Sequence, residues 1–89
     1  MDIKELALWV IDIDRRLFTL KAFKKDKILH PSIIAKECDR SIQNISRAIH
    51  ELEEQSIVKS IDKKISWRKY MITEKGKKVL NEIEKIYNK

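Results

Sequence analysis

The chain has 89 residues, of which 43% are hydrophobic and 38% are charged. A chain of this length supports one small domain with a single core, so we expect one domain over residues 1–89 and no two-lobed enzyme cleft. One glycine and one proline are too few for sandwiches, barrels or phosphate-cradling loops, which need repeated turns with positive φ, and they favour helices joined by short connections.

The overall charge is basic. Twenty Lys and Arg residues against fourteen Asp and Glu leave a formal charge of +6, which suits nucleic acid or an acidic membrane surface as partner. The longest apolar run, residues 6–11, is far shorter than the roughly 20 residues that span a bilayer, so no membrane association by a spanning helix is expected. A single cysteine, Cys38, and the lack of a secretion-type N-terminal pattern predict a cytoplasmic protein without an internal disulfide.

Residues 1–24 have the apolar periodicity of a helix that packs along one side. The spacings alternate between three and four along Ile3, Leu6, Val10, Ile13, Leu17 and Leu20. Asp2 with Glu5 three residues later predicts a capping box at the start. Either Asp12 or Asp14 could cap a second helix, so one long helix and two shorter ones both fit the pattern.

Residues 31–55 have the pattern of two helices joined by a tight turn. Pro31 suits the first turn of a helix that runs to about Cys38, with Ile33, Ile34 and Ala35 facing inward. Ser41 predicts the cap of the next helix, whose inward set is Ile42, Ile45, Ala48, Ile49 and Leu52. Backbone N–H groups at the two helix starts, near Ser32 and Ser41, would face phosphate oxygens.

The outward side of that second helix is polar, and acidic residues begin only at Glu51. It carries Gln43, Arg47 and His50, with Asn44 and Ser46 on its flanks. Gln and Asn bond bidentately to adenine and Arg to guanine, and each good pair contributes about 1–3 kcal/mol of discrimination. We therefore expect this face to enter the major groove of DNA, the alternative being an ordinary solvated helix face.

Residues 57–73 read as a β-hairpin. The β-leaning runs 57–61 and 70–73 are separated by a basic loop. Ile28 and Leu29 are too few for an independent strand, but they could pair with these runs. Trp67 either anchors the base of this hairpin or stands exposed. Phosphates or the minor groove are the expected targets of the basic side chains Lys63, Lys64 and Arg68.

The last predicted helix covers residues 74–88, with Thr73 as its cap. Its apolar side follows Gly76, Val79, Leu80, Ile83 and Tyr87, with Ile86 adjacent. Little chain is left to cover the stripe of Val79, Ile83 and Ile86. We therefore expect a homodimer through the N- and C-terminal helices.

This order of elements is that of a winged helix-turn-helix. Three motifs, Pro-Ser-Ile-Ile-Ala-Lys at 31–36, Asn-Ile-Ser-Arg-Ala-Ile at 44–49 and Thr-Glu-Lys-Gly at 73–76, resemble archaeal winged-helix transcription regulators of the MarR/ArsR-like kind. The resemblance, which covers most of the chain, implies a mostly α (α+β) fold with a two- or three-stranded β-wing, a homodimer, and double-stranded operator DNA as partner. It places DNA contacts at Ser41, Gln43, Asn44, Ser46 and Arg47, and wing contacts at Lys63, Lys64 and Arg68.

The sequence departs from that family at three points. The family usually has a glycine after the recognition helix, so Gln55 or Ser56 is expected in a left-handed conformation that costs on the order of 1 kcal/mol. Trp67 stands where the wing usually has a glycine, and His30 replaces the hydroxyl cap before Pro31. These departures bear on the wing path more than on the recognition helix.

No nucleophile lies near an obvious base in the sequence, so we expect no enzyme and no cofactor. Cys38, His30 and His50 do not have zinc-ligand spacing, so no metal site is expected, and Cys38 is interpreted as a small buried residue at the helix-turn-helix corner. Two alternatives to a DNA-binding regulator fit the pattern. One is a winged helix that binds an acidic protein surface, and the other is a binder of structured RNA or of DNA without sequence preference.

Overall fold

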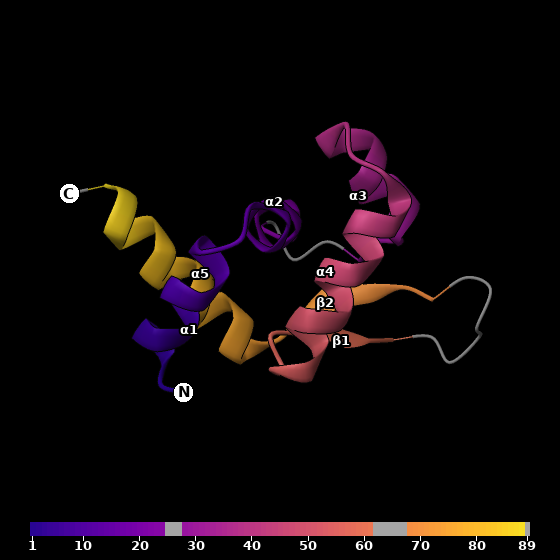
Figure 1. Cartoon of the computed structure of the whole chain (residues 1–89). Helices are drawn as coiled ribbons and strands as arrows, with labels where there is room; N and C mark the ends of the chain where they lie inside the picture. Colours follow the sequence, from indigo (N-terminus) through magenta and orange to yellow (C-terminus); the bar gives the residue numbers. More distant parts are fainter. Residues whose placement is uncertain (25–27, 62–67, 89) are drawn as a thin grey trace.

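The computed structural model describes residues 1–24, 28–61 and 68–88. In these parts the chain forms a mostly helical winged helix-turn-helix, as the sequence predicts (Figure 1). The order of elements is α1 (Ile3–Ile11), α2 (Asp14–Ala22), α3 (Pro31–Cys38), α4 (Ile42–Glu54), β1 (Val58–Ser60), β2 (Tyr70–Ile72) and α5 (Glu74–Tyr87).

The N-terminal segment is two helices rather than one long helix. The predicted capping box is confirmed: the Glu5 N–H donates to Asp2 Oδ1 at 2.8 Å, and the Asp2 N–H donates to Glu5 Oε1 at 3.2 Å. The expectation that Asp12 or Asp14 caps the second helix is wrong. Ile13, in extended backbone, is the N-cap of α2 and makes no side-chain cap bond. Asp14 instead lies in the first helical turn, where a carboxylate interacts favourably with the helix dipole.

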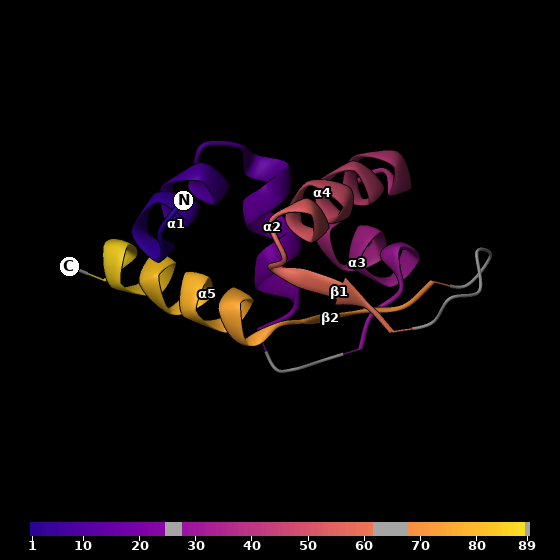
Figure 2. The same ribbon diagram turned by 90° about the horizontal axis from the view of Figure 1, so that it is seen from below.

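The helices pack around one hydrophobic core. Helix α1 lies along α5 at one end of the molecule, while α2 and α3 pack against α4 and the wing projects at the other end (Figures 1 and 2). Core side chains come from every helix and both strands; the largest fully buried ones include Phe23, Leu6, Leu20, Ile34, Ile45, Ile49, Leu52, Ile57 and Ile83.

The C-terminal apolar stripe is covered within the chain, contrary to the expectation that it lacks a cover. Val79 and Ile83 are 0% and 1% exposed, and Ile86 packs against the core as a half-buried side chain. Because α1 packs along α5, most of this stripe belongs to the core of one chain. Tyr87, expected on the same side, is exposed at the last residue of the helix.

Two isoleucines that were expected inside are exposed. Ile33 is 45% and Ile42 is 48% exposed. Each stands beside the core-facing stripe of its own helix: α3 buries Ile34 and Ala35, and Ile42 is the first residue of α4, one turn before the first buried position, Ile45. The start of α4 therefore extends past the core.

The wing is a short antiparallel hairpin with the predicted extra pairing. Val58 pairs with Ile72 and Ser60 with Tyr70. Leu29 forms an isolated bridge to Tyr70, in which each backbone N–H donates to the other residue's carbonyl at 2.9 Å. The predicted loop residues Lys63, Lys64 and Trp67 lie outside the described residues.

Two non-glycine residues have left-handed backbone among the described residues. Ser56, directly after α4, has φ 60°, which confirms the expectation for Gln55 or Ser56. Asp39, the C-cap of α3, has φ 53° and ψ 47° and makes the tight turn to α4. Aspartate tolerates this conformation better than most residues do, since its short polar side chain bonds locally.

Candidate nucleic-acid interface

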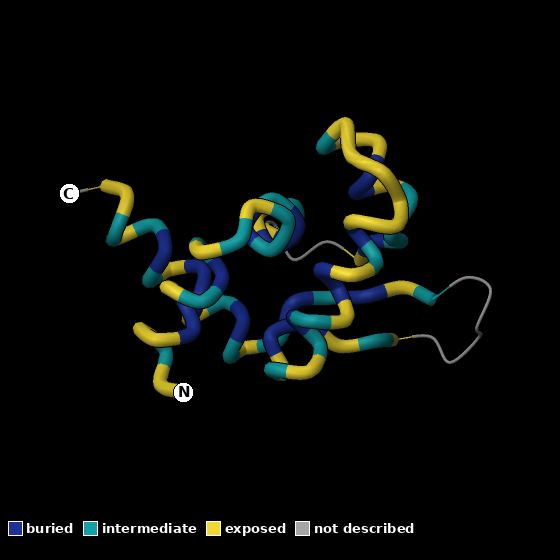
Figure 3. Tube along the Cα trace, viewed as in Figure 1, coloured by how far each residue is buried: buried dark blue, intermediate teal, exposed yellow. Residues whose placement is uncertain are grey.

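The polar side of α4 faces outward, as the periodicity predicts. Ile45, Ala48, Ile49 and Leu52 are buried, and the opposite side presents Gln43, Asn44, Arg47 and His50 as exposed residues, with Ser46 half-buried beside them. Residues 39–44, which form the turn and the start of α4, are all exposed and stand at the outer end of the molecule (Figure 3). The first turn of α4 is thus free to approach a flat or grooved partner.

A groove separates this helix from the wing and brings several predicted site residues together. Its volume is about 340 Å³. Helix α4, the start of α3 and the second wing strand each contribute to its lining, which consists of Ile42, Ser46, His50, His30, Pro31, Arg68 and Tyr70. Ser46, His50 and Arg68 are therefore neighbours in space, although Arg68 is 18 or more residues away from the other two in sequence.

The described part of the wing is basic. Lys59 and Lys69 are exposed and Arg68 is half-buried. In the sequence, these three residues flank the segment that contains Lys63 and Lys64. Of these three, Arg68 lines the groove beside α4, which places a positive charge next to this helix, as a polyanion-binding surface requires.

The helix starts near Ser32 and Ser41 are capped by side chains. Ser41 Oγ accepts a bond from the Asn44 N–H at 3.2 Å. His30 Nδ1 accepts from the Ser32 N–H at 3.1 Å and lies 2.7 Å from Ser32 Oγ. The N–H groups of Ser32 and Asn44 are therefore occupied by caps rather than free, and a partner would meet the hydroxyl groups and the other first-turn donors.

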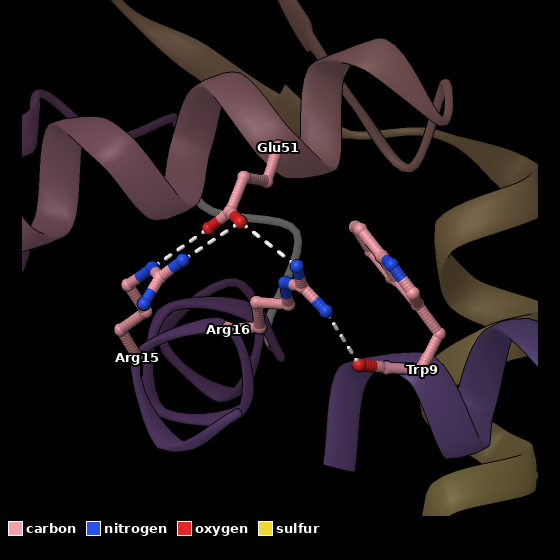
Figure 4. Close-up of polar contacts among 4 residues, drawn as sticks. All are labelled: Trp9, Arg15, Arg16 and Glu51. Atoms are coloured by element: carbon pink, nitrogen blue, oxygen red, sulfur yellow. Dashed lines mark hydrogen bonds and ion pairs between the residues drawn. The ribbon is translucent and has the colours of Figure 1, made fainter. Parts of the chain in front are cut away.

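Sequence reasoning missed a charged cluster that fixes α4 against the N-terminal helices. Glu51 on α4 accepts three hydrogen bonds from two consecutive arginines of α2 (Figure 4). Arg15 Nε donates to Glu51 Oε1 and Arg15 Nη2 to Oε2, both at 2.8 Å. Arg16 Nη2 donates to Oε2, also at 2.8 Å.

Arg16 extends the same cluster to α1. Its Nη1 donates to the Trp9 carbonyl at 3.0 Å, and its guanidinium carbon lies 3.9 Å from the centroid of the Trp9 ring, a cation–π distance. The Arg16 side chain is only 12% exposed. Arg15 and Arg16 thus connect α2 to both α1 and α4. This cluster helps to fix the position of α4 relative to the N-terminal helices.

The cluster shifts the pKa values of Glu51 and Arg15. Hydrogen bonds from Arg15, and then from Arg16, lower the pKa of Glu51 from 4.5 to about 2 against the opposing effect of burial. The hydrogen bond to Glu51 in turn raises the pKa of Arg15. Glu51 and Arg15 therefore stay charged at neutral pH, and the Glu51 carboxylate bonds to α2 rather than serving the outward face of α4.

The surroundings of Cys38 are those of a packed side chain rather than of a reactive group. Cys38 packs against the core, and its Sγ lies 3.9 Å from the Phe18 carbonyl oxygen. Burial, and then the charge of Glu37, raises the pKa of this thiol, which disfavours a reactive thiolate. Within residues 1–24, 28–61 and 68–88, no group of three or more His, Cys, Asp or Glu side chains is placed to hold a metal ion. None of the helices described here has both the length and the apolarity to cross a bilayer.

Neither a protein-family model nor a curated protein matches the sequence. Solved structures do match the fold over nearly the whole chain. A mutant of TubR, a type III plasmid segregation protein, superposes with a TM-score of 0.85 at 13% identity, covering 100% of this chain and 96% of that one. TubR bound to 24 bp of tubC from Bacillus thuringiensis serovar israelensis gives 0.83 at 13% identity, over 97% and 96% of the two chains.

A third match is more similar in sequence. A mutant of Staphylococcus aureus MepR, bound to an oligodeoxyribonucleotide, superposes with a TM-score of 0.72 at 22% identity, over 96% of this chain and 65% of that one. The TM-scores establish a shared winged-helix fold, whereas identities this low show nothing beyond the fold. Residue roles in this chain therefore have to be argued from its own side chains.

Proposed function

We propose that the protein is a sequence-specific DNA-binding transcription regulator that places α4 in the major groove and its wing on the phosphate backbone or in the minor groove. The observation that carries the proposal is the outward face of α4. Exposed Gln43, Asn44 and Arg47 stand in the N-terminal half of the helix, and Arg68 of the wing lies across a groove from Ser46 and His50 of the same helix. Amide and guanidinium groups at that position match base edges.

The structural neighbours support a nucleic-acid partner. One TubR structure contains tubC DNA and one MepR structure contains an oligodeoxyribonucleotide. MepR is also described as a transcription regulator of the multidrug efflux pump MepA. The motif resemblance to archaeal MarR/ArsR-like regulators points to the same class of function.

The proposed DNA site has two sets of residues, one that reads bases and one that binds the DNA backbone. Gln43, Asn44 and Arg47 read bases, because they lie on the first two turns of the outward face. Hydroxyl, imidazole and basic groups around them bind phosphate and sugar. This second set comprises Ser32, Ser41, Ser46, His50 and Arg68, together with Lys63 and Lys64, which are proposed from the sequence alone.

We further propose that residues 1–89 form one domain of a cytoplasmic homodimer that reads two half-sites about 34 Å apart. We propose that the subunits meet through the N- and C-terminal helices, and the outer side of α1 supports a contact at this end of the molecule. Met1 and Leu8 are 61% and 52% exposed and line a shallow apolar hollow with Trp9 and Ile11. Sedimentation equilibrium tests the subunit count, and a monomeric mass at micromolar concentration with and without duplex contradicts the dimer.

Replacement of Arg47 by alanine tests its proposed base-reading role. A duplex is first selected from a random pool, and its affinity is compared with that of a scrambled duplex by fluorescence polarisation. Arg47→Ala is expected to weaken binding to the selected duplex by about 1–3 kcal/mol, roughly 5- to 150-fold. Binding to the scrambled duplex should weaken only a few-fold, since it depends mainly on charge.

Lys85→Ala is the matched control, because it removes one positive charge from an exposed position in the last turn of α5, the helix that packs along α1 rather than α4. It should change both affinities little. Equal losses on the selected and scrambled duplexes from Arg47→Ala would contradict base reading. Equal competition by structured RNA would favour the RNA-binding alternative.

A further inference from the structure

One large aliphatic side chain stands within the polar tip of α4. Ile42 is 48% exposed, and every other residue of the exposed run 39–44 is polar or charged. A single exposed isoleucine is ordinary on a protein surface. The position of Ile42 is what matters, because the N-terminal residues of a recognition helix are the ones that reach base edges.

The groove beside α4 shows which way Ile42 faces. Ile42, Ser46 and His50 follow each other at intervals of four residues, so they form one line along the helix, and all three line the groove toward the wing. Gln43 and Arg47 form the adjacent line on the outward face. Ile42 therefore lies level with Gln43 but offset toward the wing, where Arg68 lines the same groove.

Resting on the proposed function, we propose that Ile42 is a specificity-determining residue that contacts the 5-methyl group of a thymine. This methyl group is the apolar feature of the major groove, and aliphatic side chains pack against it. Gln43 and Arg47 read hydrogen-bonding edges next to it, and Arg68 holds the phosphate backbone on the opposite wall of the groove. The preferred duplex then contains, in each half-site, one thymine whose methyl group is required.

Deoxyuridine in place of thymine tests this contact, since the exchange removes only the methyl group. Each thymine of the selected duplex is replaced in turn, and the affinity is measured by fluorescence polarisation. One position in each half-site should lose about fourfold in affinity, which corresponds to the ~0.8 kcal/mol of one buried methyl-sized group. With Ile42→Ala the same exchange should change affinity by less than about 1.5-fold.

Ile33→Ala is the matched control, because Ile33 is 45% exposed but belongs to α3. This variant should keep the fourfold sensitivity. If no thymine is sensitive in the unmodified protein, or if the sensitivity persists in Ile42→Ala, the inference is wrong although DNA binding stands. If no duplex can be selected at all, the proposed function itself fails, and the thymine contact fails with it.

Discussion

Gly76→Ala is expected to destabilise the protein by about 2–3 kcal/mol, the usual cost of forcing atoms into a closed site. A Cβ at this position would overlap the backbone carbonyl oxygen of Ile57 and lie 2.6 Å from Ile72 Cγ1. The carbonyl cannot move aside easily, because it also accepts the Thr73 N–H at 3.0 Å. Alanine's better helix propensity, worth about 1 kcal/mol, does not offset such an overlap.

The measurement is thermal unfolding followed by circular dichroism. For a domain of this size, the expected loss lowers the melting temperature by about 10–20 °C. Lys78→Ala, at an exposed position two residues further along the same helix, should shift it by no more than a few degrees. A Gly76→Ala protein as stable as the parent would contradict the close approach of α5 to the β1 end of the wing.

The Thr-Glu-Lys-Gly motif at residues 73–76 connects the start of α5 to the end of α4. The Thr73 hydroxyl accepts the Gly76 N–H at 2.9 Å and lies 2.7 Å from the Ser56 carbonyl oxygen and 3.0 Å from that of Ile57. The threonine therefore ties the start of α5 to the segment that follows α4. Gly76 lets the backbone of α5 approach the backbone of Ile57 closely. The motif therefore positions the start of the wing against both α4 and α5.

Glu51→Gln is expected to cost about 2 kcal/mol at pH 7, because the Arg16–Glu51 ion pair is nearly enclosed. Arg16 is 12% and Glu51 21% exposed, and a hydrogen bond between charged groups is worth more than a neutral one. An amide can accept from one arginine but carries no charge to balance the other. Urea unfolding at pH 7 measures the difference.

The cost of Glu51→Gln should depend on pH in one direction. The arginines hold the pKa of Glu51 at about 2 in the folded chain, against 4.5 as its ordinary value. A carboxyl group whose pKa is lowered by folding stabilises the fold fully above its unfolded pKa, and this contribution is lost as the pH falls through the folded value. The difference between parent and Glu51→Gln should therefore be constant above about pH 5 and shrink between pH 4.5 and 2.

Glu54→Gln is the matched control, an exposed carboxyl group on the same helix. Among the described residues, no ion pair involves this side chain, so the substitution should change stability by less than about 0.5 kcal/mol at any pH. A Glu51→Gln cost that stays unchanged down to pH 2 would contradict the assignment of the effect to the carboxylate.

The fold was predictable because its signals are local. Apolar periodicity defined the helices, and side-chain caps at Asp2, Ser41 and Thr73 marked three helix starts within one residue. The left-handed backbone at Ser56 was expected from the family resemblance, because the family usually has a glycine after the recognition helix. The break between α1 and α2 was harder to place, because Ile13 begins α2 without a side-chain cap.

The sequence could not show what depends on contacts between distant residues. Arg15 and Arg16 are 36 and 35 residues from Glu51, and no spacing rule links them, although two consecutive arginines after a helix break were a visible clue. Ile42 fits the inward period of α4, yet the core ends before the first turn of the helix. Where a core ends is set by packing, which periodicity does not encode.

The outward face of α4 and the basic wing together are expected to bind duplex DNA through charge and base contacts. This binding is tested most directly by fluorescence polarisation of a labelled duplex in increasing NaCl. Four to five phosphate contacts per subunit predict that the logarithm of the affinity falls with the logarithm of salt concentration with a slope of about −4 per subunit. A flat salt response, or no binding at low salt, would contradict this expectation.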